Sequence, residues 1–381
     1  MIIDEKSTIE VLRKAKKVLL LEPDYIRQYP PLALAKISSF VKSNGGEVEF
    51  SREWISKKFD LICITTLFTT DSKTVVECIK SIKSNFFTKD IPILIGGIFA
   101  SLMPEYIDER FKSAMIYKGY SKVLDEYIPD YSIDWKTKHP WDNACITFTT
   151  RGCPNKCGYC MVWRMEPEFY IEKNWKKSIL DNDKEIALIS DNNFLSSNEK
   201  HITDVCDVLS KSGKKVIFNN GVDVRIMTEE KANNLAKIKF MSNGYQGLRF
   251  AFDRMEDDGY YQKACELMIK KLDKKNLASV GQTYVLFNFT DTPQEAYYRA
   301  QECWKYRSYP YLMQFRPLNL LSKKNTYVGK HWTKNLSHAF KTWGQMNGFN
   351  TGDRTFETWI KSNKSKVKLN DEDWDKWFYK R

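Results

Sequence analysis

Short apolar runs alternate with helical stretches along the first part of the chain. The runs have the length and the β-branched composition of buried strands. They fall at 18–22, 48–51, 61–66 and 91–95, with helical stretches between them at 32–43 and 72–83. Strands that alternate with helices in this way predict a doubly wound domain of Rossmann type over residues 1–135.

The same alternation continues through the middle of the chain. Strand-like runs fall at 144–149, 185–190, 215–219, 248–252, 282–287 and 312–317. Repeated strand and helix units predict a parallel α/β sheet, and six of them make a partial (β/α)6 TIM-like barrel over residues 136–320. The working residues of such a barrel lie at the carboxyl ends of its strands.

The last segment, residues 321–381, has a different pattern and is expected to be mostly helical. It carries 13 Lys and Arg against 6 Asp and Glu, more than half of the net charge of +12. Aromatic residues are interleaved with these charges: Tyr327, Trp332, Phe340, Trp343, Phe349, Phe356, Trp359, Trp374, Trp377, Phe378 and Tyr379. Such rings stack on bases in nucleic-acid-binding proteins, but at helical spacing they more often form a buried helix face. The pattern favours packing over nucleic-acid contact.

The composition of the whole chain sets the class of protein. Of the 381 residues, 42% are hydrophobic and 28% are charged, which excludes a disordered or low-complexity chain. No apolar run approaches the roughly 18 residues of a membrane span, and the opening residues lack the apolar core of a secretion signal. A cytoplasmic protein that does not enter a membrane, with mostly reduced thiols, is therefore expected.

Three of the nine cysteines stand together. Cys153, Cys157 and Cys160 lie within eight residues of a loop rich in Gly and Pro, whereas the other six are isolated in apolar or helical contexts typical of small buried thiols. Three neighbouring thiolates can hold one soft metal centre. A structural zinc site would need a fourth ligand nearby, but His201 and Cys206 are more than forty residues further on.

The spacing C-x3-C-x2-C, with Tyr159 directly before the third cysteine, resembles the signature of the radical SAM superfamily. The resemblance implies a [4Fe-4S] cluster held by the three cysteines, with one iron left for S-adenosyl-L-methionine. It also implies reductive cleavage of that cofactor to a 5′-deoxyadenosyl radical, hydrogen abstraction from a substrate C–H bond, and an electron donor such as flavodoxin or ferredoxin. The fold alone does not identify the substrate.

Polar residues at the expected strand ends extend this resemblance. The segment 190–194 looks like an element that many family members place beside the cofactor, and 219–225 resembles the third strand end of the family. Cofactor-binding residues implied by the resemblance are Tyr159, Asp191, Asn193, Asp223, Arg225 and Asp253. Each of the last five fits a structural hydrogen bond equally well. Thr228 and Thr292 are predicted to cap helices, with Pro293 at the first helical position.

The first domain resembles the cobalamin-binding domain of one large radical SAM group. The loops that carry this resemblance contain Thr65, Leu67, Gly96 and Gly97. The motif D-x-H-x-x-G, whose histidine binds cobalt, is absent: residues 50–54 read FSREW, and the first histidine of the chain is His139. The resemblance leaves two alternatives, cobalamin bound without a histidine or a domain that keeps the shape without the cofactor.

Three functional hypotheses follow. The first is a radical SAM enzyme acting on an unidentified C–H bond, with the N-terminal domain as a scaffold or substrate platform. The second is a cobalamin-dependent radical SAM methyltransferase, and the third is a non-catalytic cluster or zinc protein that binds nucleic acid. A methylthiotransferase would resemble this chain but use three N-terminal cysteines for a second cluster, and only Cys63 and Cys78 precede residue 140.

Overall fold

The computed structural model describes residues 1–26, 29–53, 55, 57–242, 244–347, 355–363 and 367–378. The chain divides into two compact units, one formed by residues 1–187 with 318–325 and the other by 188–317 with 326–381. The predicted borders after residues 135 and 320 differ from this division, and the three-domain layout stays a prediction. The residues Trp54, Phe349 and Tyr379, used in the sequence analysis, lie outside the described ranges.

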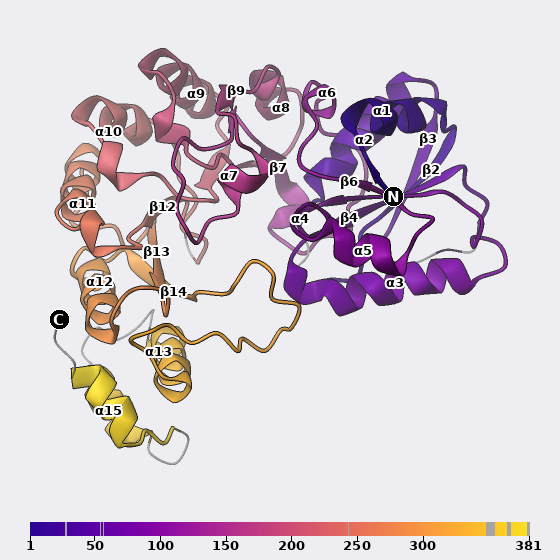
Figure 1. Cartoon of the computed structure of the whole chain (residues 1–381). Helices are drawn as coiled ribbons and strands as arrows, with labels where there is room; N and C mark the ends of the chain where they lie inside the picture. Colours follow the sequence, from indigo (N-terminus) through magenta and orange to yellow (C-terminus); the bar gives the residue numbers. More distant parts are fainter. Residues whose placement is uncertain are drawn as a thin grey trace. The chain divides into compact units, whose positions relative to one another are not determined.

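A six-stranded sheet organises the first unit (Figure 1). Its order is β1-β6-β5-β4-β2-β3, and every pair of neighbours is parallel. The strands are β1 (Ile2–Ile3), β2 (Lys17–Leu21), β3 (Glu47–Ser51), β4 (Leu61–Thr66), β5 (Ile93–Gly97) and β6 (Met115–Tyr117). The strand order reverses between β2 and β4, which is the topological switch point of a doubly wound sheet.

Helices cover both faces of this sheet. They are α1 (Glu5–Lys14), α2 (Leu32–Ser43), α3 (Ser72–Ser84), α4 (Ile98–Leu102), α5 (Pro104–Arg110) and α6 (Lys122–Asp125). Apolar residues of α1 and α2 form one core with one face of the strands, and those of α3, α4 and α5 form a second core on the other face. Figure 1 shows α1 and α2 on the opposite side from α3 and α5. Because both faces are covered, all six residues of β4 are buried.

The remainder of the first unit carries shorter elements. They are β7 (Ala144–Thr147), β8 (Thr150–Arg151), β9 (Tyr170–Ile171), α7 (Val162–Met165) and α8 (Trp175–Leu180). Strands β8 and β9 form an antiparallel pair. A further three-stranded sheet has the order β11-β10-β7, with β10 at Ile186–Ile189 and β11 at Lys215–Phe218.

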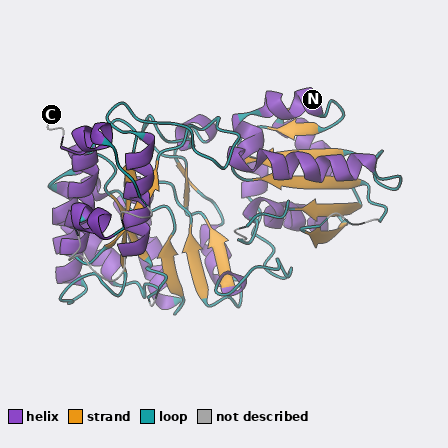
Figure 2. Ribbon diagram, turned by 90° about the horizontal axis from the view of Figure 1, so that it is seen from below, coloured by secondary structure: helices purple, strands orange, loops and turns teal. Residues whose placement is uncertain are grey.

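The second unit contains a parallel sheet in the order β12-β13-β14. Its strands are β12 (Leu248–Ala251), β13 (Gly281–Phe287) and β14 (Tyr309–Gln314), and the helices α9 (Glu199–Lys211), α10 (Glu229–Ala236), α11 (Tyr260–Lys271) and α12 (Pro293–Lys305) alternate with the strands of this unit. Figure 2 shows helices flanking the strands of each unit. All six strands predicted for the middle of the chain are present, whereas their closure into one partial barrel stays a prediction.

The last residues form α13 (Lys334–Asn347), α14 (Phe356–Ser362) and α15 (Asp371–Phe378). Most of their aromatic residues pack into one cluster, in which the rings of Phe356 and Trp377 lie 4.4 Å apart and Phe340 and Trp343 are fully buried, whereas Phe378 is 66% exposed. This burial agrees with the packing interpretation of the aromatic pattern. No helix in the described part of the chain is long and apolar enough to cross a membrane.

Candidate functional site

The three clustered cysteines lie on the loop between β8 and α7. All three are half-buried, and none of them forms a disulfide. Hydrogen bonds within the loop hold its second half: the backbone N–H of Cys160 and the indole N–H of Trp163 both donate to the carbonyl oxygen of Cys157, each over 3.0 Å. The N–H of Val162 lies 3.4 Å from the Cys160 Sγ atom, which accepts its hydrogen bond. The loop is therefore a folded turn with its sulfur atoms near the surface.

The loop begins at a residue that only glycine suits. Gly152 has φ of +73°, and a Cβ atom placed there would lie 2.0 Å from the carbonyl oxygen of Glu168. The N–H of Gly152 donates to the Glu166 Oε2 atom over 2.9 Å. A carboxylate that follows the cysteines thus binds the backbone that precedes them, and the two ends of the loop are fixed to each other.

Arg151, next to this glycine, adds a second connection. The residue is 8% exposed, with Nε 3.0 Å from Asp125 Oδ2 and Nη2 3.4 Å from Glu166 Oε1. It also lies 4.0 Å from the centre of the Phe148 ring. Burial lowers the pKa of Arg151, but Asp125 and Glu166 outweigh that effect, and the net direction is upward. The guanidinium charge joins the start of the cysteine loop to helix α6.

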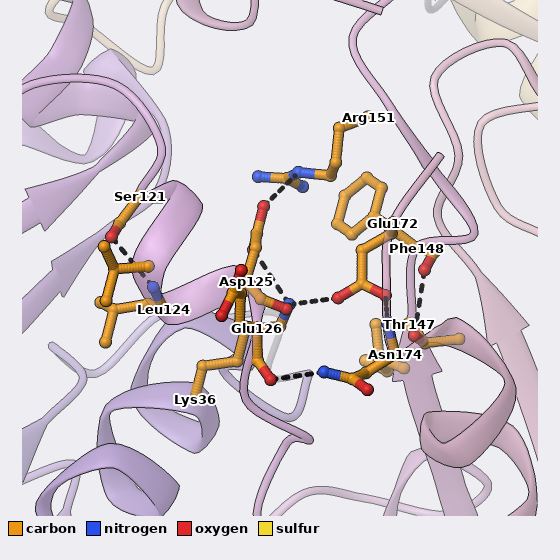
Figure 3. Close-up of polar contacts among 12 residues, drawn as sticks. Lys36, Ser121, Leu124, Asp125, Glu126, Thr147, Phe148, Arg151, Glu172 and Asn174 are labelled. Atoms are coloured by element: carbon orange, nitrogen blue, oxygen red, sulfur yellow. Dashed lines mark hydrogen bonds and ion pairs between the residues drawn. The ribbon is translucent and has the colours of Figure 1, made fainter. Parts of the chain in front are cut away.

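A second buried cation completes the cluster (Figure 3). Lys36 of α2 is 5% exposed, and its Nζ atom lies 2.9 Å from Asp125 Oδ1 and 3.3 Å from Glu172 Oε1. The Tyr170 hydroxyl donates to Asp125 Oδ2 over 3.1 Å, and the Asn174 N–H donates to Glu172 Oε2 over 2.9 Å. Asp125 therefore accepts hydrogen bonds from Lys36 and Tyr170 and forms an ion pair with Arg151, which joins three segments. We call Lys36, Asp125, Arg151, Glu166 and Glu172 the buried charge cluster.

Burial has the largest effect on the pKa of one carboxyl group of this cluster, Glu172. Burial raises the pKa of Glu172, and the nearby Lys36 ammonium group opposes the rise.

A neighbouring cavity of about 300 Å³ is lined by Lys122, Glu126, Glu168 and Lys173 among others. These side chains pair with one another, Lys122 with Glu168 over 2.6 Å and Lys173 with Glu126 over 3.2 Å. The charges of this cavity are satisfied within the protein, so it offers no evident ligand site.

The cysteine loop has the donor atoms for a soft metal centre. Three thiols on one short loop match an iron–sulfur cluster in type and number. Within the described residues, no group of three or more His, Cys, Asp or Glu side chains is arranged to hold a metal ion.

Of the strand-end residues predicted from the resemblance, the structure brings three together. The Asn193 amide donates to Asp223 Oδ2 over 3.0 Å, and Arg225 donates to both oxygens of Asp223 over 2.8 and 2.6 Å. Burial alone would raise the pKa of Asp223, but the bonds from Arg225 and Asn193 lower it overall. Asp253 binds elsewhere, since its Oδ1 atom accepts from the Leu286 N–H over 2.9 Å.

Asp191 is 3% exposed, and Tyr159 is half-buried in the cysteine loop. The predicted caps are confirmed: Thr228 accepts from Lys231, and Thr292 forms a capping box with Glu295 ahead of Pro293. Structural hydrogen bonds thus account for much of the polar pattern that follows the strands.

The four residues proposed for a cobalamin loop lie at the carboxyl end of the first sheet. A Cβ atom at Gly97, where φ is +97°, would lie 2.2 Å from the Thr66 carbonyl oxygen, so packing against β4 requires this glycine. Hydrogen bonds to Tyr25 hold the backbone of Thr65 and Leu67. The Tyr25 hydroxyl donates to the Thr65 carbonyl over 3.3 Å and accepts from the Leu67 N–H over 3.4 Å. At the neighbouring Gly96, by contrast, an added Cβ would meet no atom within 4 Å.

A segment from far along the chain covers part of this edge. We call residues 318–325 the strap. The Thr69 hydroxyl donates to the Leu320 carbonyl over 2.8 Å, and the Ser72 hydroxyl donates to the Leu321 carbonyl over 3.0 Å. The Leu321 side chain packs against the core on the α3 face. The strap therefore lies over the start of α3, directly after β4 at the switch point.

One member of a buried ion pair lies within residues 50–54, where the resemblance would place a cobalt-binding histidine. Arg52, directly after β3, lies 2.7 Å from Glu22, directly after β2, and both are buried. Arg52 also donates to the carbonyl oxygens of Trp135 and Lys136. Burial raises the pKa of Glu22 to about 7, against the opposing effect of Arg52.

Comparisons with known proteins add one finding. No family model matches the chain, and no curated protein matches it. Among the solved structures that match is the crystal structure of methylornithine synthase (PylB), with 12% sequence identity and a TM-score of 0.33, covering 60% of this chain and 70% of that chain. The mixed α/β fold with parallel sheets rests on the chain's own strand order. A likeness of this size assigns the chain neither to a family nor to an activity.

Proposed function

We propose that the protein is a radical SAM enzyme whose three cysteines, Cys153, Cys157 and Cys160, hold a [4Fe-4S] cluster. The observation that carries this proposal is the cysteine loop itself, which places three half-buried cysteines on one turn and has its two ends bonded to each other. When bound and reduced, such a cluster supplies the electron that cleaves S-adenosyl-L-methionine to a 5′-deoxyadenosyl radical, which then takes a hydrogen atom from substrate.

The chain's own residues prepare this loop. Gly152 lets the backbone turn beside the Glu168 carbonyl, and Glu166 and Arg151 hold the two loop ends at fixed positions. Fixed ends reduce the freedom that the loop loses when its thiols bind a metal. Asn193, Asp223 and Arg225, held in one hydrogen-bonded group, are proposed as part of the cofactor site together with Tyr159, Asp191 and Asp253.

For the N-terminal domain we favour the role of a scaffold over that of a cobalamin carrier. Packing explains Gly97, Thr65 and Leu67, and the strap covers the start of α3 at the switch point. The alternative, cobalamin-dependent methylation without a histidine ligand, predicts a bound corrinoid. Its visible absorption spectrum after incubation with hydroxocobalamin distinguishes the two proposals.

The partner and the compartment follow from the proposed chemistry. A one-electron donor of flavodoxin or ferredoxin type would reduce the cluster, and a reducing cytoplasm would keep the thiols available. The third hypothesis, a non-catalytic cluster or zinc protein that binds nucleic acid, predicts no cleavage of S-adenosyl-L-methionine.

The decisive experiment is anaerobic reconstitution with iron and sulfide. We expect about four iron atoms per chain and formation of 5′-deoxyadenosine from S-adenosyl-L-methionine under dithionite. Cys157→Ala is expected to lose both, because it removes one of only three thiolate ligands. The matched control is Cys206→Ala, which removes a buried isolated thiol of α9 and leaves the loop intact. A reconstituted chain without iron, or a Cys157→Ala variant with full cleavage, would refute the proposal.

A further inference from the structure

The sheet β12-β13-β14 has two faces of different character. Phe250 and Thr283 point to the face covered by α11, where the Tyr261 hydroxyl bonds Thr283 over 3.0 Å and the Tyr261 ring lies against Phe250. Arg249 and Tyr284 have the opposite parity in their strands and lie on the other face, which we call the inner face. Tyr311 lies directly opposite Tyr284 in the register and shares this face.

Arg249 is held in place on the inner face by neutral acceptors. Its Nη1 atom donates to the Tyr284 hydroxyl over 2.8 Å and to the side-chain and backbone oxygens of Asn219 over 3.0 and 3.2 Å, while Nε donates to the Gln246 carbonyl over 3.2 Å. The Tyr284 hydroxyl in turn donates to the Asn219 carbonyl over 2.7 Å. The guanidinium group is therefore fixed in position while its positive charge is not neutralised.

This lack of a carboxylate sets Arg249 apart from other arginines of the chain. Seven arginines of the described ranges are buried or half-buried, and five of them pair with a carboxylate. These five are Arg52, Arg151, Arg225, Arg254 and Arg299. Among the described residues, neither Arg249 nor Arg316 has such a pair. A half-buried cation without a counter-charge is costly, and an anion from solution would offset the cost.

The surroundings suggest what kind of anion would fit. The rings of Tyr284 and Tyr311 lie 6.0 Å apart at 81°, and Tyr311 is 40% exposed. Arg316, just beyond the end of β14, and Lys341 of α13 add positive charge near Tyr311. Burial and the charge of Arg316 lower the pKa of Lys341, which is the expected effect of cations gathered without a carboxylate. Flat aromatic walls beside a fixed guanidinium group favour a planar ring that carries an oxyanion.

We propose that the inner face of β12-β13-β14 binds the carboxylate or phosphate group of a small aromatic ligand, with Arg249 as the anion-binding residue and Tyr284 and Tyr311 as the ring-binding residues. That this ligand is the substrate rests on the proposed radical SAM function, whereas the binding itself does not. Arg249 offers the planar fork of donors that matches both kinds of oxyanion.

Calorimetric titration of the full-length protein with phenyl phosphate, benzoate and the neutral benzyl alcohol tests this proposal. We expect at least one of the two anions to bind at least tenfold more tightly than benzyl alcohol at low ionic strength, and the tighter anion to identify the oxyanion that the site prefers. Equal affinity for all three ligands would overturn the proposal.

Variants assign the effect to Arg249. Arg249→Gln is expected to weaken anion binding at least tenfold, and more than it weakens benzyl alcohol binding, because it removes the positive charge and the guanidinium donors but keeps both tyrosine rings. The matched control is Arg254→Gln, whose half-buried guanidinium group lies 3.3 Å from Asp257 and is already neutralised. Unchanged anion binding in Arg249→Gln would contradict the proposal. Should that variant fold poorly, Tyr284→Phe, which removes one anchor of Arg249, is expected to weaken anion binding several-fold and serves the same test.

The two proposals fail separately. Formation of 5′-deoxyadenosine by reconstituted protein that shows no preference for aromatic anions would overturn the inner-face site and leave the radical SAM function standing. Anion binding that depends on Arg249 in a protein that holds no iron would do the reverse.

Discussion

Two arginines of this protein illustrate opposite uses of a partly buried positive charge. Arg151 is 8% exposed, lies between two carboxylates and stacks on Phe148. Its charge is neutralised by these carboxylates, and the ion pairs hold the start of the cysteine loop. Arg249 is half-buried and held by neutral oxygen atoms of Asn219, Gln246 and Tyr284. An arginine that is paired with carboxylates connects segments of the chain, as Arg151 does. An arginine that is held in position without a carboxylate, such as Arg249, can bind an anion from solution.

The strongest test of this contrast acts on Asp125. Asp125→Asn would leave Lys36 and Arg151 with one full carboxylate fewer inside the buried charge cluster. Breaking such a buried pair costs about 3–5 kcal/mol of unfolding free energy, and we expect a loss in that range by urea denaturation. The cysteine loop should also bind iron less completely on reconstitution, since Arg151 would lose one of its anchors.

The adjacent residue provides the control. Glu126 pairs with Lys173 at the surface, where the two side chains are 58% and 72% exposed. Glu126→Gln is therefore expected to cost less than about 1 kcal/mol. Equal losses in Asp125→Asn and Glu126→Gln would show that the buried charge cluster does not fasten the loop.

A second test uses pH. Burial raises the pKa of Glu22 from 4.5 to about 7, so between these values the folded protein binds a proton that the unfolded chain releases. The free energy of unfolding from this group therefore falls as the pH rises through that window, by up to about 3 kcal/mol. The glutamine of Glu22→Gln cannot lose a proton. The melting temperature of the variant, relative to that of the wild type, should therefore rise from pH 5 to pH 8.

The control for this pH test is Glu49→Gln, which alters an exposed pair with Lys57. Its melting temperature should follow that of the wild type at every pH. If the melting temperature of Glu22→Gln also changed with pH as that of the wild type does, the buried Glu22–Arg52 pair would not titrate in this range.

The smallest expected effect concerns the strap. Thr69→Val removes the hydroxyl that donates to the Leu320 carbonyl and should cost about 1 kcal/mol of unfolding free energy, with faster amide exchange in residues 318–325. Thr70→Val, on the next residue of the same turn and half-buried, is the matched control. Unchanged exchange in Thr69→Val would mean that this bond does not hold the strap.

The hydrophobic pattern predicted most of the strands because a central parallel strand is buried at every position and therefore mostly apolar. Strand β4 was predicted with its observed bounds, Leu61–Thr66. The pattern missed β1 (Ile2–Ile3) and β6 (Met115–Tyr117), which are too short for an apolar run to stand out. It placed β14 three residues late, since the observed strand begins at Tyr309 and includes a proline, which weakens the strand signal.

The site was predictable only where its chemistry is local in sequence. The spacing of the three cysteines is visible in the sequence, and Arg151 and Gly152 directly precede the first of them. Lys36 and Glu172 meet across 136 residues, and no local pattern reports such a pair. A weak signal was present in Lys36, a lysine placed in the otherwise apolar stretch of α2, where only a buried partner would make the charge tolerable.

The strap has a consequence for synthesis on the ribosome. The first unit includes residues 1–187, but its last eight residues, 318–325, follow only after 130 more have been added. At about 5–20 residues per second, the emerging unit waits on the order of ten seconds before the strap can cover the start of α3. During that interval the core around Val75 and Ile79 lacks Leu321, so a nascent chain stalled before residue 318 should be more sensitive to protease at this edge than the finished protein.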